Sequence, residues 1–256
     1  HGDMASYAEA KGRLFSWPGL RAAVINADDP QGDIYRRQLA AEVSCLRYSL
    51  DAKSRADVVA ETVAPSLAGL RLTVRYGAQR VTLQSALLGR FNASNLLAVL
   101  AGLLTLGYDL QAAAAALANV PPVAGRMQCL REGQSPLAVV DYAHTPDALE
   151  QALKAAREHT TGKLWCVFGC GGGRDTGKRV EMGRIAAELA DELVLTTDNP
   201  REEAPESILK DIQQGVQGRD ALVLLDRAEA IAYALTHAAS DDVVLVAGKG
   251  HETYQE

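Results

Sequence analysis

The chain has 256 residues, of which 48% are hydrophobic and 23% charged; this excludes disordered and fibrous proteins and leaves room for two globular domains. Its net charge of −6 offers no general attraction to phosphate backbones or anionic lipid, so nucleic acid is not an expected partner. The longest near-apolar stretch, Leu96 to Tyr108, is shorter than the roughly 20 residues that span a bilayer. The four cysteines form no C-x-x-C pair, and we expect them to be reduced thiols of a cytoplasmic protein.

The first half of the chain mixes helical and strand patterns. Helices are predicted over 4–15, 96–106 and 110–117. Strands are predicted at 22–26, 43–48, 58–62, 70–76 and 80–85. The last three strands alternate apolar and polar residues, which indicates an antiparallel meander that turns at Gly77-Ala78, and Asp28-Asp29-Pro30 is interpreted as a turn. Asn92 and Asn95 lie at the head of an apolar helix, where such residues are more often caps than ligand contacts.

The second half of the chain has a more regular rhythm. Short apolar or β-branched runs predict strands at 137–140, 164–168, 193–197, 222–225 and 243–246. Helical spacing of apolar residues occurs at 147–158, 180–189, 206–216 and 228–238. Their alternation predicts βαβ units in a parallel, doubly wound sheet. Because Pro121-Pro122 and Gly125 mark the change of pattern, we place a domain boundary near residue 124.

Four polar clusters directly follow predicted strands of this second half. They are 141–144, 169–179, 198–201 and 248–252. Ligands of open parallel sheets bind beyond the carboxyl ends of the strands. Any one cluster has the alternative reading of an ordinary strand-to-helix turn, but four on one edge favour a binding site.

The glycine-rich segment Gly169 to Arg179 fits neither common nucleotide motif. A frame from Gly172 reads G-x-x-x-x-G-K, but Arg179 stands where a magnesium-binding Ser or Thr belongs. The dinucleotide pattern from Gly169 fails because Arg174 occupies its last glycine position, which disfavours an NAD-dependent oxidoreductase. A flexible backbone with several cations remains, and it suits phosphate or carboxylate oxygens.

Charged residues of both signs occur in these clusters. Asp198, Arg201 and Glu252, together with Arg174, would suit a zwitterionic amino acid, since a guanidinium pairs with a carboxylate and carboxylates accept from an ammonium. A set of ordinary surface salt bridges explains the same residues equally well.

The ordered motifs of the chain closely resemble the Mur ligase family, and within it the members that add meso-diaminopimelate. The resemblance rests on His1–Met4, Asn26–Asp29, Gly89–Asn95, Gly125–Met127, Val140–Asp147, Gly169–Arg179, Asp198–Arg201 and Ala247–Glu252. It implies that 125–256 form a Rossmann-like C-terminal domain with a mainly parallel sheet, which receives the amino acid. It implies that 1–124 are the latter part of a mixed α/β ATPase domain, whose P-loop lies upstream of His1.

The resemblance also implies a reaction in peptidoglycan synthesis. The terminal carboxylate of UDP-N-acetylmuramoyl-L-alanyl-D-glutamate attacks the γ-phosphate of ATP, and an amine of meso-diaminopimelate then attacks the resulting acyl phosphate. Mg²⁺ neutralises charge on the transferring phosphoryl group. We therefore expect these three substrates and Mg²⁺ as ligands of a cytoplasmic, monomeric ligase, and we expect the chain alone to be inactive for lack of the P-loop.

Site residues follow from the same resemblance, position by position. The metal residues are His1 and Lys11, with Lys11 carbamylated so that it presents oxygen to the metal. The residues at the reaction centre are Lys11, His144 and Lys178. The nucleotide-binding residues are Asn92, Asn95, Arg126 and Asp141. The residues of the amino-acid pocket are Arg174, Asp198, Asn199, Arg201, Gly248 and Glu252.

Arg201 carries the sharpest expectation of substrate choice. Diaminopimelate differs from lysine by one carboxylate at its far end, and an arginine pairs with that carboxylate in two-pronged fashion, whereas lysine leaves the arginine uncompensated. The alternatives are a lysine-adding Mur ligase and a catalytically silent fragment that only binds an amino acid. Folylpolyglutamate synthetase is a more remote relative, against which the Asp198–Arg201 motif speaks.

Overall fold

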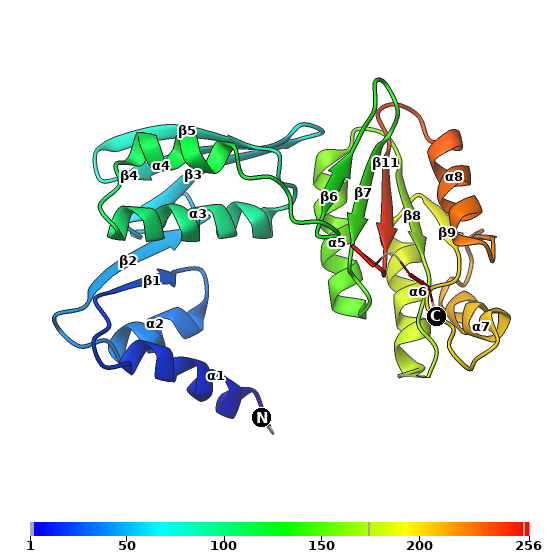
Figure 1. Ribbon diagram of the computed structural model, residues 1–256, viewed down its shortest axis with the longest axis horizontal. Helices are drawn as coiled ribbons and strands as arrows, with labels where there is room; N and C mark the ends of the chain where they lie inside the picture. Colours follow the sequence, from blue (N-terminus) through cyan, green and yellow to red (C-terminus); the bar gives the residue numbers. More distant parts are fainter. Residues whose placement is uncertain (1–2, 174, 253, 256) are drawn as a thin grey trace. The chain divides into compact units, whose positions relative to one another are not determined.

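The structure, a computed structural model, describes residues 3–173, 175–252 and 254–255 (Figure 1). The chain divides into two compact units, each of which is described by itself. The first unit is His1–Ala64, Leu70–Ser85 and Arg90–Val120. The second unit is Pro65–Gly69, Ala86–Gly89 and Pro121–Glu256. No helix in the described ranges combines the length and the apolar character that a membrane crossing needs.

A five-stranded sheet of order β1-β2-β3-β4-β5 occupies the first part of the chain. Its strands are β1 (Ala22–Asn26), β2 (Ser44–Ser49), β3 (Val58–Ser66), β4 (Gly69–Tyr76) and β5 (Gln79–Ser85). Strands β1, β2 and β3 pair in parallel. Strands β4 and β5 form the predicted antiparallel hairpin, with Tyr76 opposite Gln79 and Gly77 at a positive φ of 57° in the turn.

The helices of this part of the chain are α1 (Met4–Gly12), the 3-10 helix η1 (Arg13–Ser16), α2 (Pro30–Arg37), α3 (Arg90–Thr105) and α4 (Leu110–Ala118). Of these, α2, α3 and α4 pack against the sheet. The interpretation of Asp28-Asp29-Pro30 as a simple turn misses α2. The Asp29 carboxylate caps that helix by accepting from the Gln31 N–H at 2.9 Å, and Pro30 occupies its first position.

The second unit contains a six-stranded sheet of order β10-β9-β8-β11-β7-β6. Its strands are β6 (Gln128–Leu130), β7 (Leu137–Asp141), β8 (Leu164–Phe168), β9 (Glu192–Leu195), β10 (Leu222–Val223) and β11 (Val243–Ala247). Its helices are α5 (Pro146–His159), α6 (Gly177–Leu189), α7 (Pro205–Gly215) and α8 (Arg227–His237). Every pairing is parallel except that of β6 with β7. The predicted mixed α/β class with a mainly parallel second sheet is therefore confirmed, and β6 is an edge strand that the sequence pattern missed.

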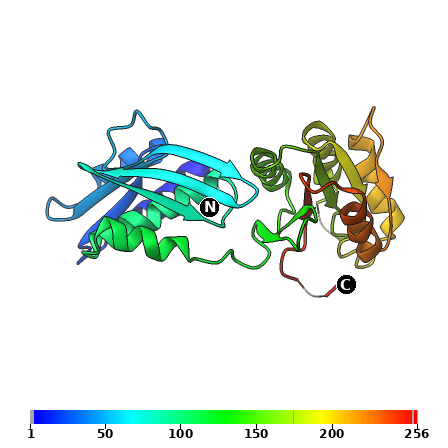
Figure 2. The same cartoon turned by 90° about the horizontal axis from the view of Figure 1, so that it is seen from above.

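Helices lie on both faces of this second sheet (Figures 1 and 2), and an apolar core fills each side. Along β8, Leu164, Cys166 and Phe168 face the core shared with α5, α6 and α7. The intervening Trp165 and Val167 face the core shared with α8. Because both faces are covered, the strands are continuously apolar, and polar side chains are confined to the ends of the strands.

Candidate functional site

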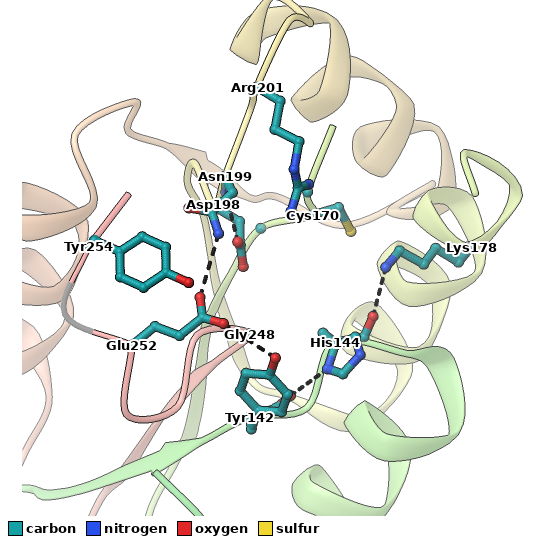
Figure 3. A pocket seen from close by; sticks show the side chains of 12 residues that line it. Tyr142, His144, Cys170, Lys178, Asp198, Asn199, Arg201, Gly248, Glu252 and Tyr254 are labelled. Carbon is teal, nitrogen blue, oxygen red and sulfur yellow. Dashed lines mark hydrogen bonds between the residues drawn. The ribbon is translucent and has the colours of Figure 1, made fainter. Parts of the chain in front are cut away.

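A cavity of about 270 Å³ opens at the carboxyl ends of β7, β8, β9 and β11 (Figure 3). It is lined by Tyr142, His144, Gly169, Cys170, Gly171, Lys178, Asp198, Asn199, Arg201, Gly248, Glu252 and Tyr254. All of these residues belong to the second unit. Parallel strands bring their carboxyl ends to one edge of a sheet, which is why loops distant in sequence meet here.

The acidic side of the cavity is formed by Asp198 and Glu252. The Asp198 side chain is buried, and it lies so close to Gly248 that a Cβ there would stand 2.6 Å from Asp198 Oδ2. Glu252 accepts from the Tyr142 hydroxyl at 3.3 Å and from Lys249 Nζ at 3.4 Å. Burial opposes ionisation of Glu252, but the Lys249 ammonium and the hydrogen bonds outweigh it and hold the pKa of the carboxyl below its ordinary value. Glu252 is thus a carboxylate at neutral pH.

The basic side of the cavity is formed by His144, Lys178 and Arg201. Lys178 Nζ donates to the His144 carbonyl at 2.9 Å. His144 Nδ1 lies 2.8 Å from the Tyr142 carbonyl oxygen, which can only accept, so Nδ1 is the donor of this hydrogen bond. Arg201 has a positive φ of 52°, and its Nη1 donates to the Gly172 carbonyl at 2.8 Å.

Two residues predicted to serve the nucleotide lie beside this cavity. The Arg126 guanidinium stacks over the Tyr142 ring, 4.7 Å from the ring centroid. The Asp141 carboxylate accepts from the Met127 and Ala143 N–H groups at 2.8 and 2.9 Å. Burial raises the pKa of Asp141, and those two hydrogen bonds oppose the shift.

Several predicted residues are not among those that line the cavity. Lys11, Asn92 and Asn95 belong to the first unit, where Asn95 Nδ2 donates to Asn92 Oδ1 at 3.2 Å. His1 and Arg174 lie outside the described residues.

The described residues do not by themselves fit a magnesium site. In the ranges that the structure covers, no group of three or more His, Cys, Asp or Glu side chains could hold a metal ion. Lys11 Nζ lies 5.1 Å from the centroid of the Tyr7 ring, and hydrogen bonding to Tyr7 raises the pKa of its ammonium. Carbamylation of Lys11 stays a prediction.

Comparisons with known proteins place the chain in a family. Residues 1–103 match the Mur ligase middle domain, and residues 125–250 match the glutamate ligase domain of Mur ligases. The chain belongs to the Mur ligase family. The resemblance inferred from the sequence motifs is confirmed.

Several curated relatives of this Mur ligase chain share one enzyme name. The chain is 52% identical over its full length to the UDP-N-acetylmuramoyl-L-alanyl-D-glutamate--2,6-diaminopimelate ligase of Alkalilimnicola ehrlichii, of which it covers 51%. It is 49% identical to the protein of the same name from Pseudomonas aeruginosa, of which it covers 52%. The chain therefore spans about half the length of the curated relatives it matches.

Solved structures agree with these relatives. A structure of a ligase with the same name matches 100% of the chain and 53% of its own length, with a TM-score of 0.78 and 43% identity. A MurF ligase from Thermotoga maritima in complex with ADP covers 98% of the chain at 21% identity, and the chain covers 55% of it with a TM-score of 0.70. At 21% identity, the similarity to the MurF ligase shows a shared fold and nothing more.

Sequence reasoning did not assign a role to several residues around the cavity of this Mur ligase chain. Tyr142 and Tyr254 line it, and Lys249, which is 8% exposed, donates to Asn199 Oδ1 at 2.8 Å. Lys249 belongs to a polar cluster that the sequence singles out, but spacing cannot distinguish a buried lysine from a solvated one. Cys170 also lines the cavity, and burial raises the pKa of its thiol to about 12, so it is not a nucleophile at neutral pH.

Proposed function

We propose that this chain is the amino-acid-receiving part of a ligase that joins meso-diaminopimelate to UDP-N-acetylmuramoyl-L-alanyl-D-glutamate. The proposed reaction consumes ATP and passes through an acyl phosphate, in the cytoplasmic stage of peptidoglycan synthesis. The observation that carries the proposal is the cavity of mixed charge on a chain about half identical to enzymes of that name.

The charges around the cavity suit a ligand that carries both signs at each end. Asp198 and Glu252 supply acceptors for an ammonium group, and Arg201 supplies a planar donor pair for a carboxylate. Diaminopimelate has an ammonium and a carboxylate at both ends. Lysine lacks the second carboxylate and would leave Arg201 facing no anionic partner on the ligand.

His144 and Lys178 are placed to assist amide formation. The neutral amine of the acceptor attacks the acyl carbon, the bond from that carbon to the phosphate oxygen breaks, and phosphate leaves. The His144 ring is held through Nδ1, and we propose that its other nitrogen, Nε2, removes the proton from the attacking nitrogen. Lys178 has further N–H donors beyond its bond to the His144 carbonyl, and these would stabilise negative charge on the leaving phosphate.

For the nucleotide we propose contact residues, and for the metal we propose no reaction step. We propose that Arg126 and Asp141, beside the cavity, and Asn92 and Asn95, in the first unit, contact ATP. Mg²⁺ is proposed as the counterion of ATP, and no step is assigned through it because the described residues do not make a site for it.

Calorimetric titration of the chain with meso-diaminopimelate and with L-lysine tests the binding half of this proposal. We expect diaminopimelate to bind about tenfold to a hundredfold more tightly, which is the range for one charge-assisted hydrogen-bonded pair. Equal affinities would point to a pocket that does not recognise the second carboxylate, and no binding of either amino acid would reject the amino-acid site.

Ligase activity is tested by joining the chain to the remaining half found in its relatives. Phosphate release in the presence of ATP, Mg²⁺ and the UDP-dipeptide must then depend on diaminopimelate.

A further inference from the structure

A buried arginine lies behind the cavity without lining it. Arg179 is in the first turn of α6, and its side chain is 1% exposed. Its Nη1 donates to Asp211 Oδ2 and its Nη2 to Glu203 Oε1, both at 2.9 Å. A guanidinium is withdrawn from water only at a large cost unless it is ion-paired and hydrogen-bonded. The two carboxylates supply that compensation, so the three side chains form one rigid unit.

Glu203 extends this ion pair to the glycine-rich loop after β8. The same Oε1 accepts from the Gly173 N–H at 2.6 Å, and Arg179 Nη2 also lies 3.4 Å from the Gly171 carbonyl oxygen. The hydrogen bonds from Arg179 and Gly173 lower the pKa of Glu203, so it remains a carboxylate across the neutral range. Arg179 and Glu203 therefore hold both ends of the segment Gly171–Gly173.

That glycine segment is in direct backbone contact with the loop that carries Arg201. The Gly172 N–H donates to the Asn199 carbonyl at 2.9 Å, and Arg201 Nη1 donates to the Gly172 carbonyl at 2.8 Å. A Cβ at Gly172 would stand 2.0 Å from the Pro200 carbonyl oxygen, so no side chain fits between the two loops. Any movement of Gly172 would move the oxygen to which the Arg201 guanidinium is anchored.

The backbone of Arg201 itself depends on this support. A positive φ of 52° is unfavourable for a residue that has a Cβ atom, and such a conformation persists only where the surroundings impose it. The bond from Glu203 N–H to the Pro200 carbonyl, at 3.0 Å, closes the turn around Arg201. Glu203 thus holds Arg201 through the turn and through the glycine segment.

We infer that Arg179 and Glu203 are positioning residues that set substrate specificity, by fixing the Arg201 guanidinium where it reads the distal carboxylate of the acceptor amino acid. This inference rests on the proposed function. Neither residue lines the cavity. The Arg179 and Glu203 side chains act through Gly171–Gly173, and the Glu203 N–H closes the turn at 200–203. Loosening the ion pair should therefore weaken the binding of an amino acid that has the distal carboxylate, and leave one without it unaffected.

The test compares Glu203→Ala with Glu188→Ala. The control removes a carboxylate from an equally short Arg–Glu pair of 2.9 Å, Arg184 with Glu188, which lies on the exposed side of α6. We expect Glu203→Ala to reduce the affinity ratio of meso-diaminopimelate to lysine about tenfold, and Glu188→Ala to leave it unchanged. Glu203→Gln, which keeps an acceptor oxygen for Gly173, should restore most of the ratio.

Amide hydrogen exchange gives a second readout that needs no ligand. The Gly173 amide should exchange faster in Glu203→Ala than in Glu188→Ala and the wild type. An unchanged affinity ratio, or an equal loss for both amino acids, would overturn the inference while leaving the proposed function intact. A wild-type chain that binds no diaminopimelate would overturn the proposed function as well, so the two failures are distinguishable.

Discussion

Arg201 combines a positive φ with the proposed recognition of the distal carboxylate of the substrate. Replacement by alanine would remove the guanidinium and leave the strained φ of 52°, so the two effects would be mixed. Arg201→Asn separates them, because asparagine tolerates the left-handed region. We expect this variant to lose most of the preference for diaminopimelate over lysine and to keep its melting temperature. Calorimetry with both amino acids checks this, with Arg131→Ala as a control, since exposed Arg131 donates to the Ser240 carbonyl and does not line the cavity. A retained preference would mean that another residue reads the distal carboxylate.

His159 makes the stability of the second unit sensitive to acid. Its side chain is buried, Nε2 accepts from the Gly89 N–H at 2.9 Å, and Nδ1 lies 2.6 Å from the Ser66 carbonyl oxygen, so the ring is neutral. Burial lowers the pKa of His159, and the unfolded chain therefore binds more protons than the folded chain below about pH 6.5. We expect the free energy of unfolding to fall as the pH drops through that range. Denaturant titrations at about pH 8 and about pH 5.5 should show a larger acid loss in the wild type and in His237→Gln than in His159→Gln. Equal losses in all three proteins would reject this source of acid sensitivity.

At the scale of the element, helices α6 and α7 pack closely because Gly183 of α6 has no side chain where it faces α7. A Cβ at Gly183 would stand 2.2 Å from the Ile212 carbonyl oxygen, whereas Gly102 in α3 has nothing within 4 Å. Gly183→Ala should therefore destabilise the second unit by about 1–3 kcal/mol through overpacking. Gly102→Ala should stabilise the first unit by about 0.4–1 kcal/mol, because alanine restricts the unfolded chain and favours the helix. Thermal unfolding of the two variants measures both signs, and the same sign in both would contradict the packing account.

The elements that the sequence pattern predicts well are those buried on both sides. Strand β8 lies at 164–168 as predicted, because five consecutive buried residues leave a continuous apolar run. Helix α2 was missed because its mean character is polar and its start, Asp29-Pro30, is also a turn signal. Strand β6 is three residues long, which is too short to show an alternation of apolar and polar residues. Local patterns thus identify elements with strong burial and fail where a cap or an edge pairing decides the structure.

At the scale of the whole molecule, the rule about strand ends was enough to bring together most of the residues that line the cavity. They include His144 and Lys178, predicted for the reaction centre, and Asp198, Asn199, Arg201, Gly248 and Glu252, predicted for the amino acid. The rule included Arg179 and Lys249 in the same polar clusters but could not show that they are buried, because their burial depends on partners contributed by other loops. Nor could it relate Lys11 to this pocket, since Lys11 belongs to the other unit, and the order of motifs along a chain carries no distances between units.

The division into two units gives the pocket a thermodynamic signature. A ligand that binds only the folded second unit stabilises that unit by about 2.7 kcal/mol at a hundred times its dissociation constant, and adds nothing to a unit it does not touch. Differential scanning calorimetry should therefore resolve two transitions, of which meso-diaminopimelate raises only one. That transition must be the one that Gly183→Ala lowers, since Gly183 and the cavity belong to the same unit, while Gly102→Ala marks the other. Lysine at the same concentration should raise the temperature of this transition less, because the stabilisation grows with the logarithm of ligand concentration over dissociation constant, and we expect lysine to bind more weakly. If diaminopimelate moved the transition marked by Gly102→Ala, the amino acid would bind in the first unit, and the assignment of the pocket to the carboxyl ends of β7, β8, β9 and β11 would be wrong.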